Sequence, residues 1–176
     1  MFTKLQNNQL INQLSGIVLC VLLLFLTAQI SIPLQPVPIT LQTLGVMIVG
    51  LRFNCKVAFY SVLTYISLGA IGLPVFANFS GDLFRPAAGY LIGFLPAVVV
   101  MSRIMEFKHE SFIGNFLSCL AGTTIIFICG VSWLSIYMGL KQAVVVGVLP
   151  FIIPGMIKIF LLVTALQYLN YTKSKP

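Results

Sequence analysis

The sequence has very few acidic residues and a single histidine. Its 176 residues include three aspartates and glutamates, which are Asp82, Glu106 and Glu110, and the histidine is His109. Catalysis by paired carboxylates, a Ser-His-Asp triad or a histidine-rich metal site requires more of these groups than the chain offers. A small membrane enzyme is therefore the least favoured class, and we expect no enzymatic activity and no bound metal or cofactor.

Two kinds of motif are also missing. No segment matches GxxxxGK[ST], so the chain is not expected to carry an ATPase site of its own. The four cysteines, Cys20, Cys55, Cys119 and Cys129, include no CxxC pair. A disulfide framework and a structural zinc site are therefore both disfavoured.

Charge of either sign is scarce. Charged residues make up 7% of the chain, against about 25% in a typical soluble domain. Hydrophobic residues make up 59%, and the mean hydropathy is +1.06. This composition predicts an all-α polytopic membrane protein in a lipid bilayer. The net charge of +7 suggests no nucleic acid partner, because lysines and arginines flanking membrane helices account for it.

The apolar residues form long blocks rather than short alternating runs, which is typical of membrane helices. We expect a single transmembrane domain over residues 1–176 with six spans, and a cleaved signal peptide is the alternative for the first block. No small-x-small cleavage site follows that block. The expected bounds of the spans are 14–30, 39–51, 57–73, 87–102, 112–138 and 144–169.

The segments between these spans contain prolines and polar residues. Three prolines exclude a helix from residues 31–38, and Pro74 ends the third span before a polar loop over 74–86. A polar stretch over 103–110 separates the fourth and fifth spans. A short turn over 139–142 is expected before the last span.

Lysine and arginine residues are unevenly distributed over the predicted loops. With the N-terminus inside, only Arg85 and Lys141 lie outside, while the cytoplasmic side holds Lys4, Arg52, Lys56, Arg103, Lys108, Lys173 and Lys175. Cytoplasmic loops of membrane proteins carry an excess of these residues. We therefore predict a multi-pass protein of the cell membrane with both termini cytoplasmic and with loops 31–38 and 74–86 facing outward.

Lys158 is the one basic residue inside a predicted span. A charged side chain at the centre of a membrane helix costs about 2.5–3.5 kcal/mol on insertion scales, so it needs a partner or a watery cavity. No carboxylate lies in any predicted span, which favours an anionic ligand. The alternative is a lysine that extends to the membrane interface or bonds with backbone carbonyls freed by Pro150 and Pro154.

Three other residues could contact a ligand at the outer side. The Asn78 amide can donate and accept together, although asparagine is also frequent in turns. Arg85 lies three residues after Asp82, and the two could simply pair with each other. Tyr90 could stack on a ligand ring or belong to the interfacial aromatic belt.

Four segments of the chain form a recognisable set: IPLQPVPITLQTLGV over 32–46, GAIGLPVFA over 69–77, AAGYLIGF over 87–94 and PFIIPGMIK over 150–158. They resemble the BioY family, the biotin-binding S components of energy-coupling-factor (ECF) vitamin transporters. The third matches the family's GPTGGYLxGF segment at Gly89, Tyr90 and Gly93, and the fourth resembles its PFxPGDxxK element. The resemblance covers about residues 30 to 160.

The resemblance implies an S-component fold with six transmembrane helices, an N-in/C-in topology and an outward-facing biotin pocket. It also implies a transmembrane T component and two ATPase subunits as partners, so that ATP is used only by those subunits. In such a pocket Asn78 would bind the ureido ring, and Lys158 would meet the valerate carboxylate or a ureido oxygen. The full set of expected substrate-binding residues is Asn78, Lys158, Tyr90, Phe76, Val75, Phe79, Gly89 and Arg85.

The sequence departs from the family pattern in the last segment, where Gly155 stands at the place of the family's Asp. The leading hypothesis is high-affinity capture and uptake of biotin as the substrate-specific subunit of an ECF transporter. The alternatives are a stand-alone transporter of biotin or a small carboxylate, and an S component with altered vitamin specificity. A structural or assembly protein without a ligand is the remaining possibility.

Overall fold

The protein is mostly helical, as the long apolar blocks predict. The computed structural model describes residues 2–83, 85–107 and 111–173, with side chains over 10–83, 85–107 and 111–172. Seven α-helices occur in this part of the chain, together with one short 3₁₀ helix and a two-stranded hairpin. Their bounds are α1 Phe2–Gln29, β1 Ser31–Ile32, β2 Ile39–Thr40, α2 Gln42–Arg52, α3 Cys55–Ala70, η1 Ala77–Phe79, α4 Ala88–Phe107, α5 Phe112–Met138, α6 Leu140–Gly147 and α7 Leu149–Lys173.

Short polar and glycine residues mark several helix ends. The Asn54 side chain caps α3 by accepting a hydrogen bond from the Val57 amide at 2.9 Å. Ser111 caps α5 in the same way, with a bond of 3.0 Å from the Gly114 amide. Such caps satisfy amides that have no partner within the helix. Gly139 ends α5 with φ 78°, a backbone conformation that other residues rarely adopt.

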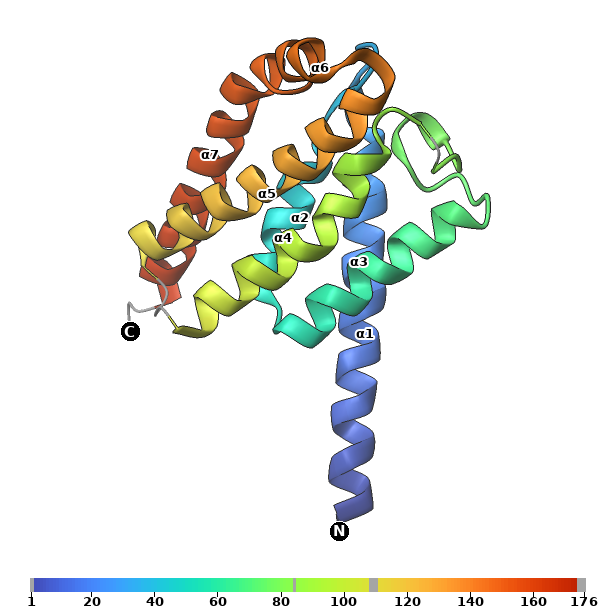
Figure 1. Cartoon of the computed structure of the whole chain (residues 1–176). Helices are drawn as coiled ribbons and strands as arrows, with labels where there is room; N and C mark the ends of the chain where they lie inside the picture. The colour runs from blue at the N-terminus through green and yellow to red at the C-terminus, as the bar shows by residue number, and fades with distance from the viewer. Residues whose placement is uncertain (1, 84, 108–110, 174–176) are drawn as a thin grey trace.

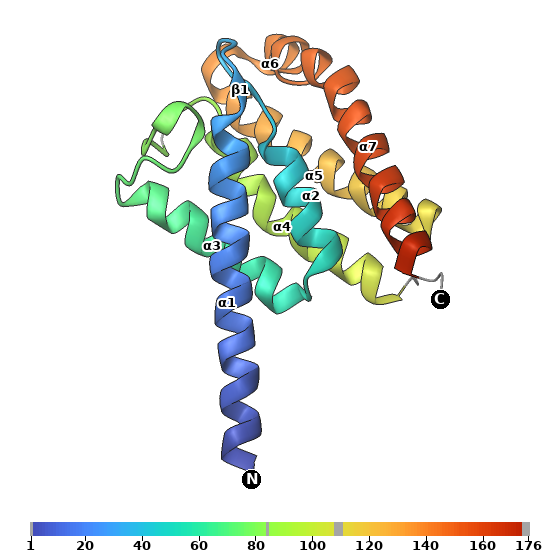
Figure 2. The ribbon, with the colours of Figure 1, turned by 180° about the vertical axis from the view of Figure 1, so that it is seen from behind.

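The helices pack around the short helix α2, which lies in the middle of the molecule (Figures 1 and 2). α2 contacts α1, α4, α5 and α7, and its residues Val46, Met47 and Val49 are fully buried. α4 and α5 make the most extensive contact between two helices, and Gly89 allows their approach because a Cβ there would overlap Trp133. Small residues allow this approach in membrane helices generally.

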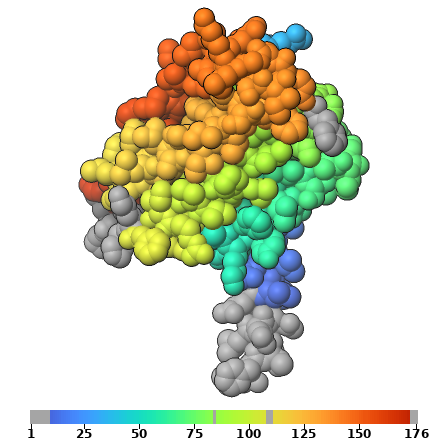
Figure 3. Space-filling view, in the orientation of Figure 1, coloured from blue at the N-terminus to red at the C-terminus, as the bar shows by residue number. Residues whose placement is uncertain are grey.

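The two ends of the molecule differ in structure. The β1–β2 hairpin, the loop around η1 and α6 lie at one end, whereas α1 begins and α7 ends at the other (Figure 1). β1 and β2 pair antiparallel, with Ser31 opposite Thr40 and Ile32 opposite Ile39. In the space-filling view α6 covers the first end, and α3 crosses in front of α1 (Figure 3).

Four helical segments of the described chain are long and apolar enough to cross a membrane. They are Leu10–Gln29, Ala88–Phe107, Phe112–Met138 and Leu140–Thr172. Cys55–Ala70 is apolar but shorter. α2 has 11 residues, which corresponds to about 17 Å against a hydrocarbon core of about 30 Å. The protein therefore surrounds α2 rather than exposing it to lipid along its whole length.

Three sequence predictions about element boundaries are wrong. The turn expected over 139–142 is confined to Gly139, because Lys141 and Gln142 lie inside α6. The last apolar block is divided at Val148, whose φ of −122° and ψ of −53° interrupt the helix between α6 and α7. The start of the polar stretch at 103 also belongs to a helix, since α4 continues to Phe107, while residues 108–110 lie outside the described residues.

Candidate functional site

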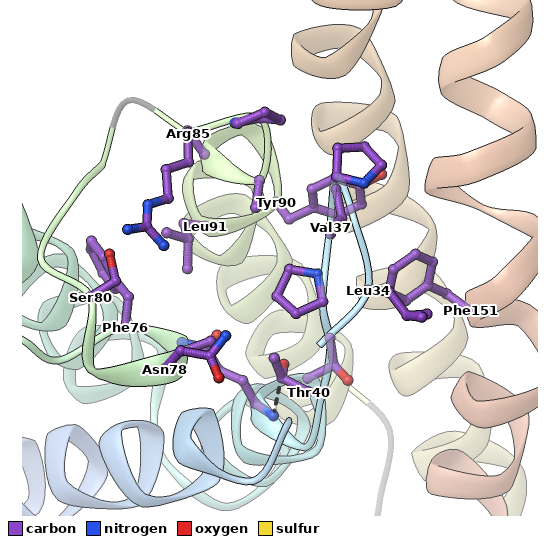
Figure 4. A pocket seen from close by; sticks show the side chains of 18 of the residues that line it. Leu34, Val37, Thr40, Phe76, Asn78, Ser80, Arg85, Tyr90, Leu91 and Phe151 are labelled. Carbon is purple, nitrogen blue, oxygen red and sulfur yellow. Dashed lines mark hydrogen bonds between the residues drawn. The ribbon is translucent and has the colours of Figure 1, made fainter. Parts of the chain in front are cut away.

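A pocket of about 380 Å³ opens at the end of the molecule that carries the hairpin and the η1 loop. This volume lies within the range of about 300–1,000 Å³ that is usual for small-molecule sites. Figure 4 shows it between Phe76, Asn78 and Ser80 on one side and Leu34, Val37 and Phe151 on the other. The walls come from the segment 33–38, the start of α2, the loop around η1, the first turns of α4, the middle of α5 and the first half of α7.

The segment between β1 and β2 forms one wall. Pro33, Pro36 and Pro38 all line the pocket, as do Leu34 and Val37. The prolines have no amide hydrogen to donate and hold their φ near −65°, so they suit a short connection that is not helical. The Gln35–Pro36 peptide bond is cis. This wall therefore presents a stiff, mainly apolar surface to whatever enters.

Aromatic side chains from α4, α5 and α7 form a second wall. The ring centroids of Tyr90 and Phe151 lie 6.3 Å apart, and those of Phe127 and Phe151 lie 6.4 Å apart. The Tyr90 hydroxyl donates to the Gly147 carbonyl oxygen at 2.8 Å. That hydroxyl is thus occupied within the protein, while the ring lines the pocket. The wall offers apolar area to a ligand ring or an alkyl chain.

Lys158 brings a positive charge to this otherwise mainly apolar cavity. Its Nζ donates to the Thr40 carbonyl oxygen at 2.6 Å and to Thr43 Oγ1 at 2.9 Å. The carbonyl belongs to β2, so the sequence-based alternative of carbonyls freed by Pro150 and Pro154 does not describe these bonds. An ammonium has three donors, and these two bonds leave one of them for a ligand. No carboxylate among the described side chains forms an ion pair with Lys158.

The more exposed rim carries Asn78, Asp82 and Arg85, with the buried Ser80 beside them. Arg85 Nε lies 3.4 Å from Asp82 Oδ2, so the pairing that the sequence suggested is present. Both side chains remain about half exposed, at 53% and 55%. Asn78 is exposed and accepts a bond from Ser31 Oγ at its Oδ1, at 3.0 Å. This orientation leaves the Asn78 amide nitrogen able to donate to a ligand oxygen.

A buried hydrogen-bonded chain supports the pocket from behind. Gln42 Nε2 donates to the Tyr65 hydroxyl at 2.7 Å, and that hydroxyl donates to the Val75 carbonyl at 2.8 Å. Phe76 packs edge-on against Tyr65, with ring centroids 5.5 Å apart. Its ring occupies the space where a Cβ at Gly69 would lie. These hydrogen bonds and the ring contact connect α2, α3 and the η1 loop behind the pocket.

The structure brings together most of the residues that the sequence singled out. Asn78, Lys158, Tyr90, Phe76 and Arg85 all line the pocket. The remaining three predicted residues, Val75, Phe79 and Gly89, are not among its lining residues.

Each of these three residues has a different position in the fold. The Val75 side chain packs against the hydrophobic core, and its carbonyl accepts from Tyr65. The Phe79 ring is 66% exposed and packs against Phe25. Gly89 provides the close contact between α4 and α5.

Sequence reasoning missed several lining residues. Thr40, Gln42 and Thr43 line the base, and Phe127 and Phe151 line the aromatic wall. Gln42 could have been found from the sequence, because an amide inside an apolar block needs a hydrogen-bond partner. Phe127 and Phe151 could not have been found in this way, because nothing in the sequence distinguishes them from other aromatic residues of apolar helices.

Comparisons with known proteins agree with this architecture. The model of the BioY family matches residues 2–174. A "Probable biotin transporter BioY" from Rickettsia prowazekii is 34% identical over 174 residues, which covers 97% of this chain and 90% of that protein. The "Biotin transporter BioY" of Thermotoga maritima is 42% identical over 155 residues, covering 86% and 90% of the two chains.

One solved structure extends the likeness to three dimensions. It is a crystal structure of "the S-component for biotin from an ECF-type ABC transporter", with a TM-score of 0.84. The identity is 26%, and the match covers 94% of each chain. The fold, the pocket at its loop-bearing end and the match along nearly the whole sequence lead to one conclusion: the chain belongs to the BioY family.

Proposed function

We propose that this protein captures biotin and mediates its uptake across the cell membrane, as the substrate-specific subunit of an ECF-type transporter. The observation that carries the proposal is the pocket of about 380 Å³, which combines an apolar aromatic wall with polar groups at both ends. Biotin has the matching chemistry, since it joins a polar ureido ring and a carboxylate through apolar atoms. The names of the relatives support the same ligand.

Lys158 is the proposed partner of the ligand carboxylate. Arg85 is already paired with Asp82, whereas Lys158 bonds to the neutral oxygens of Thr40 and Thr43 and to no carboxylate among the described side chains. An anion would therefore gain more at Lys158 than at Arg85. Asn78 is the proposed donor to the ureido oxygen, and Phe76 and Tyr90 are the proposed apolar contacts. The bonds to Thr40 and Thr43 also explain how a lysine is accommodated in an apolar helix.

Equilibrium binding of labelled biotin to the purified chain in detergent tests the capture role. We expect saturable binding that unlabelled biotin displaces and that thiamine and riboflavin do not. Displacement by either competitor would replace biotin with a broader vitamin specificity. The absence of binding in folded protein, verified by a cooperative unfolding transition, would reject the proposed function.

The proposed membrane arrangement has six crossings with both termini cytoplasmic, and it includes α2 and α3 as short spans. The pocket then opens to the outside, because it lies at the end opposite the start of α1 and the end of α7 (Figure 1). Cysteine-accessibility labelling at Leu140 and at Phe107, which lie at opposite ends of the molecule, tests this arrangement in intact cells. A membrane-impermeant reagent should label Leu140→Cys and not Phe107→Cys.

The proposed partners are a transmembrane T component and two ATPase subunits. No Walker-type segment occurs in the sequence, so energy for uptake must be supplied by another chain. Biotin uptake should therefore depend on co-expressed partner subunits, while binding should not. Uptake in cells that lack every such ATPase would instead favour a stand-alone carrier.

A second candidate, an S component for a different small carboxylate, is favoured by Gly155. This residue lies on α7 between Phe151 and Lys158, which both line the pocket, and an added Cβ there would meet no other atom within 4 Å. Position 155 thus has room for a side chain and carries no acidic group, although it does not itself line the pocket. A panel of small carboxylates in the biotin displacement assay distinguishes the two candidates.

A further inference from the structure

The η1 loop contains a backbone conformation that its residues do not prefer. Asn78 and Phe79 have φ values of 59° and 53°, which places two consecutive non-glycine residues in the left-handed region. Asparagine tolerates this region, but an aromatic residue rarely adopts it. Such a conformation persists only where surrounding contacts hold it. The question is therefore which residue holds this loop.

Gln29, the last residue of α1, bonds to the loop on both sides of Asn78. Its Nε2 donates to the Phe76 carbonyl at 3.1 Å and, at 3.4 Å, to the Val75 carbonyl. Its Oε1 accepts from the Phe79 amide at 3.1 Å. A single carboxamide therefore satisfies backbone groups before and after the residue that lines the pocket. An amide side chain carries its donor and its acceptor on two separate atoms, which matches the two bonds made here.

Other contacts close the loop or hold the Asn78 side chain, as the bond from Ser31 Oγ does, but they leave the Phe79 amide without a partner. Phe76 and Ser80 form a pair of backbone bonds, with the Phe76 amide donating at 2.8 Å and the Ser80 amide at 3.3 Å. The Phe79 ring lies edge-on to Phe25, with centroids 6.3 Å apart, and therefore packs on α1 rather than in the pocket. Gln29 therefore provides the hydrogen-bond partner of the Phe79 amide, which the bonds between Phe76 and Ser80 do not provide.

We infer that Gln29 is a positioning residue of the biotin site that acts through Asn78. By holding the left-handed turn, it directs the Asn78 amide to the pocket while the neighbouring Phe79 ring turns toward α1. The outer end of α1 is thus part of the binding site, although Gln29 does not line the pocket. This inference rests on the proposed biotin function, which supplies the ligand for the measurement.

Two substitutions separate the bonding roles of Gln29 from its volume. Gln29→Met keeps a similar length and removes the donor and the acceptor. Gln29→Glu keeps the acceptor for the Phe79 amide and places a carboxylate against the Phe76 carbonyl oxygen. Gln13→Met is the matched control, because Gln13 is an exposed glutamine of the same helix.

We expect Gln29→Met and Gln29→Glu to weaken biotin binding by about tenfold or more, because a smaller fraction of the protein has the competent loop. Gln13→Met should bind like the unaltered protein. A double-mutant cycle with Asn78→Gly tests whether Gln29 acts through Asn78, since glycine removes the side chain and still accepts a positive φ. In the Asn78→Gly background, Gln29→Met should weaken binding by less than about twofold. An equal loss of biotin affinity in both backgrounds would show that Gln29 does not act through Asn78 and would overturn the inference.

Hydrogen exchange at the Phe79 amide, measured without ligand, provides a readout that does not depend on biotin. Exchange should be faster in Gln29→Met than in the unaltered protein and in Gln13→Met. Unchanged exchange, or unchanged biotin affinity where the unaltered protein binds tightly, overturns the inference and leaves the proposed function standing. Failure of the unaltered protein to bind biotin rejects the proposed function, and the positioning role for biotin falls with it.

Discussion

The hydroxyl of Tyr90 donates to the carbonyl oxygen of Gly147 across 2.8 Å, and this bond joins α4 to the point where α6 ends. A Cβ at position 147 would overlap that hydroxyl, so the glycine makes the bond possible. The same tyrosine packs its ring on Phe151 of α7. Tyr90 therefore connects the aromatic wall of the pocket to the α6–α7 junction.

Tyr90→Phe should lower the free energy of unfolding by about 1 kcal/mol and change biotin affinity little, because the ring stays and only the hydroxyl is lost. Thermal unfolding in detergent and equilibrium binding measure the two effects. Tyr137→Phe is the control, since Tyr137 lies 52% exposed near the end of α5. A large loss of affinity with unchanged stability would instead place the Tyr90 hydroxyl against the ligand.

Lys158→Met should weaken biotin binding by more than about tenfold, because the ligand carboxylate loses a charge-assisted bond. The preference for biotin over its neutral amide should disappear in the same variant. Lys141→Met, which removes an exposed lysine of α6, should leave affinity and preference unaltered. If Arg85→Met abolishes the preference while Lys158→Met does not, the carboxylate binds at the rim.

Tyr65→Phe should reduce the free energy of unfolding by about 1–3 kcal/mol, because the buried Gln42 Nε2 and the Val75 carbonyl both lose their bond to the tyrosine hydroxyl. The double variant Gln42→Leu/Tyr65→Phe removes one of the unsatisfied groups and should be less destabilised than the sum of the single variants. Chemical or thermal unfolding of the single and double variants measures the difference. Strict additivity would show that the two side chains do not act as a unit.

Gly69→Ala should weaken biotin binding and stability together, since a Cβ there overlaps the Phe76 ring, which is 4% exposed and lines the pocket. Overpacking of this kind costs about 1–3 kcal/mol. A second change, Phe76→Leu, frees the space and should restore stability without restoring full affinity. For comparison, Gly16→Ala should be tolerated, because its nearest neighbour is Val57 Cγ1 at 3.4 Å.

The sequence predicted the long helices better than the short elements. The fifth apolar block, expected over 112–138, coincides with α5, because a serine cap and a glycine bound it. The division of the last apolar block into two helices was not predicted, although Gly147 and Pro150 flank the break at Val148 and both residue types are common where helices end and begin. The bond between Tyr90 and Gly147 also lies at this break, and spacing along the chain does not predict it.

The candidate site was predictable where a polar residue stands alone in apolar sequence. Lys158 is the clearest example, and the pocket lining includes it. The partners of such residues were not predictable from spacing. Thr40 is far from Lys158 along the chain, and Gln29 is far from Phe79. These pairs depend on the tertiary arrangement of α1, the hairpin and α7.

The pocket draws its walls from segments that leave the ribosome at very different times. The Pro-rich hairpin and the η1 loop are made before α7, which supplies Phe151 and Lys158. A nascent chain that has not yet inserted α7 therefore has an open groove that lacks Phe151 and Lys158. A chain made only as far as α6 thus lacks part of the pocket and cannot hold the ligand as the whole pocket does.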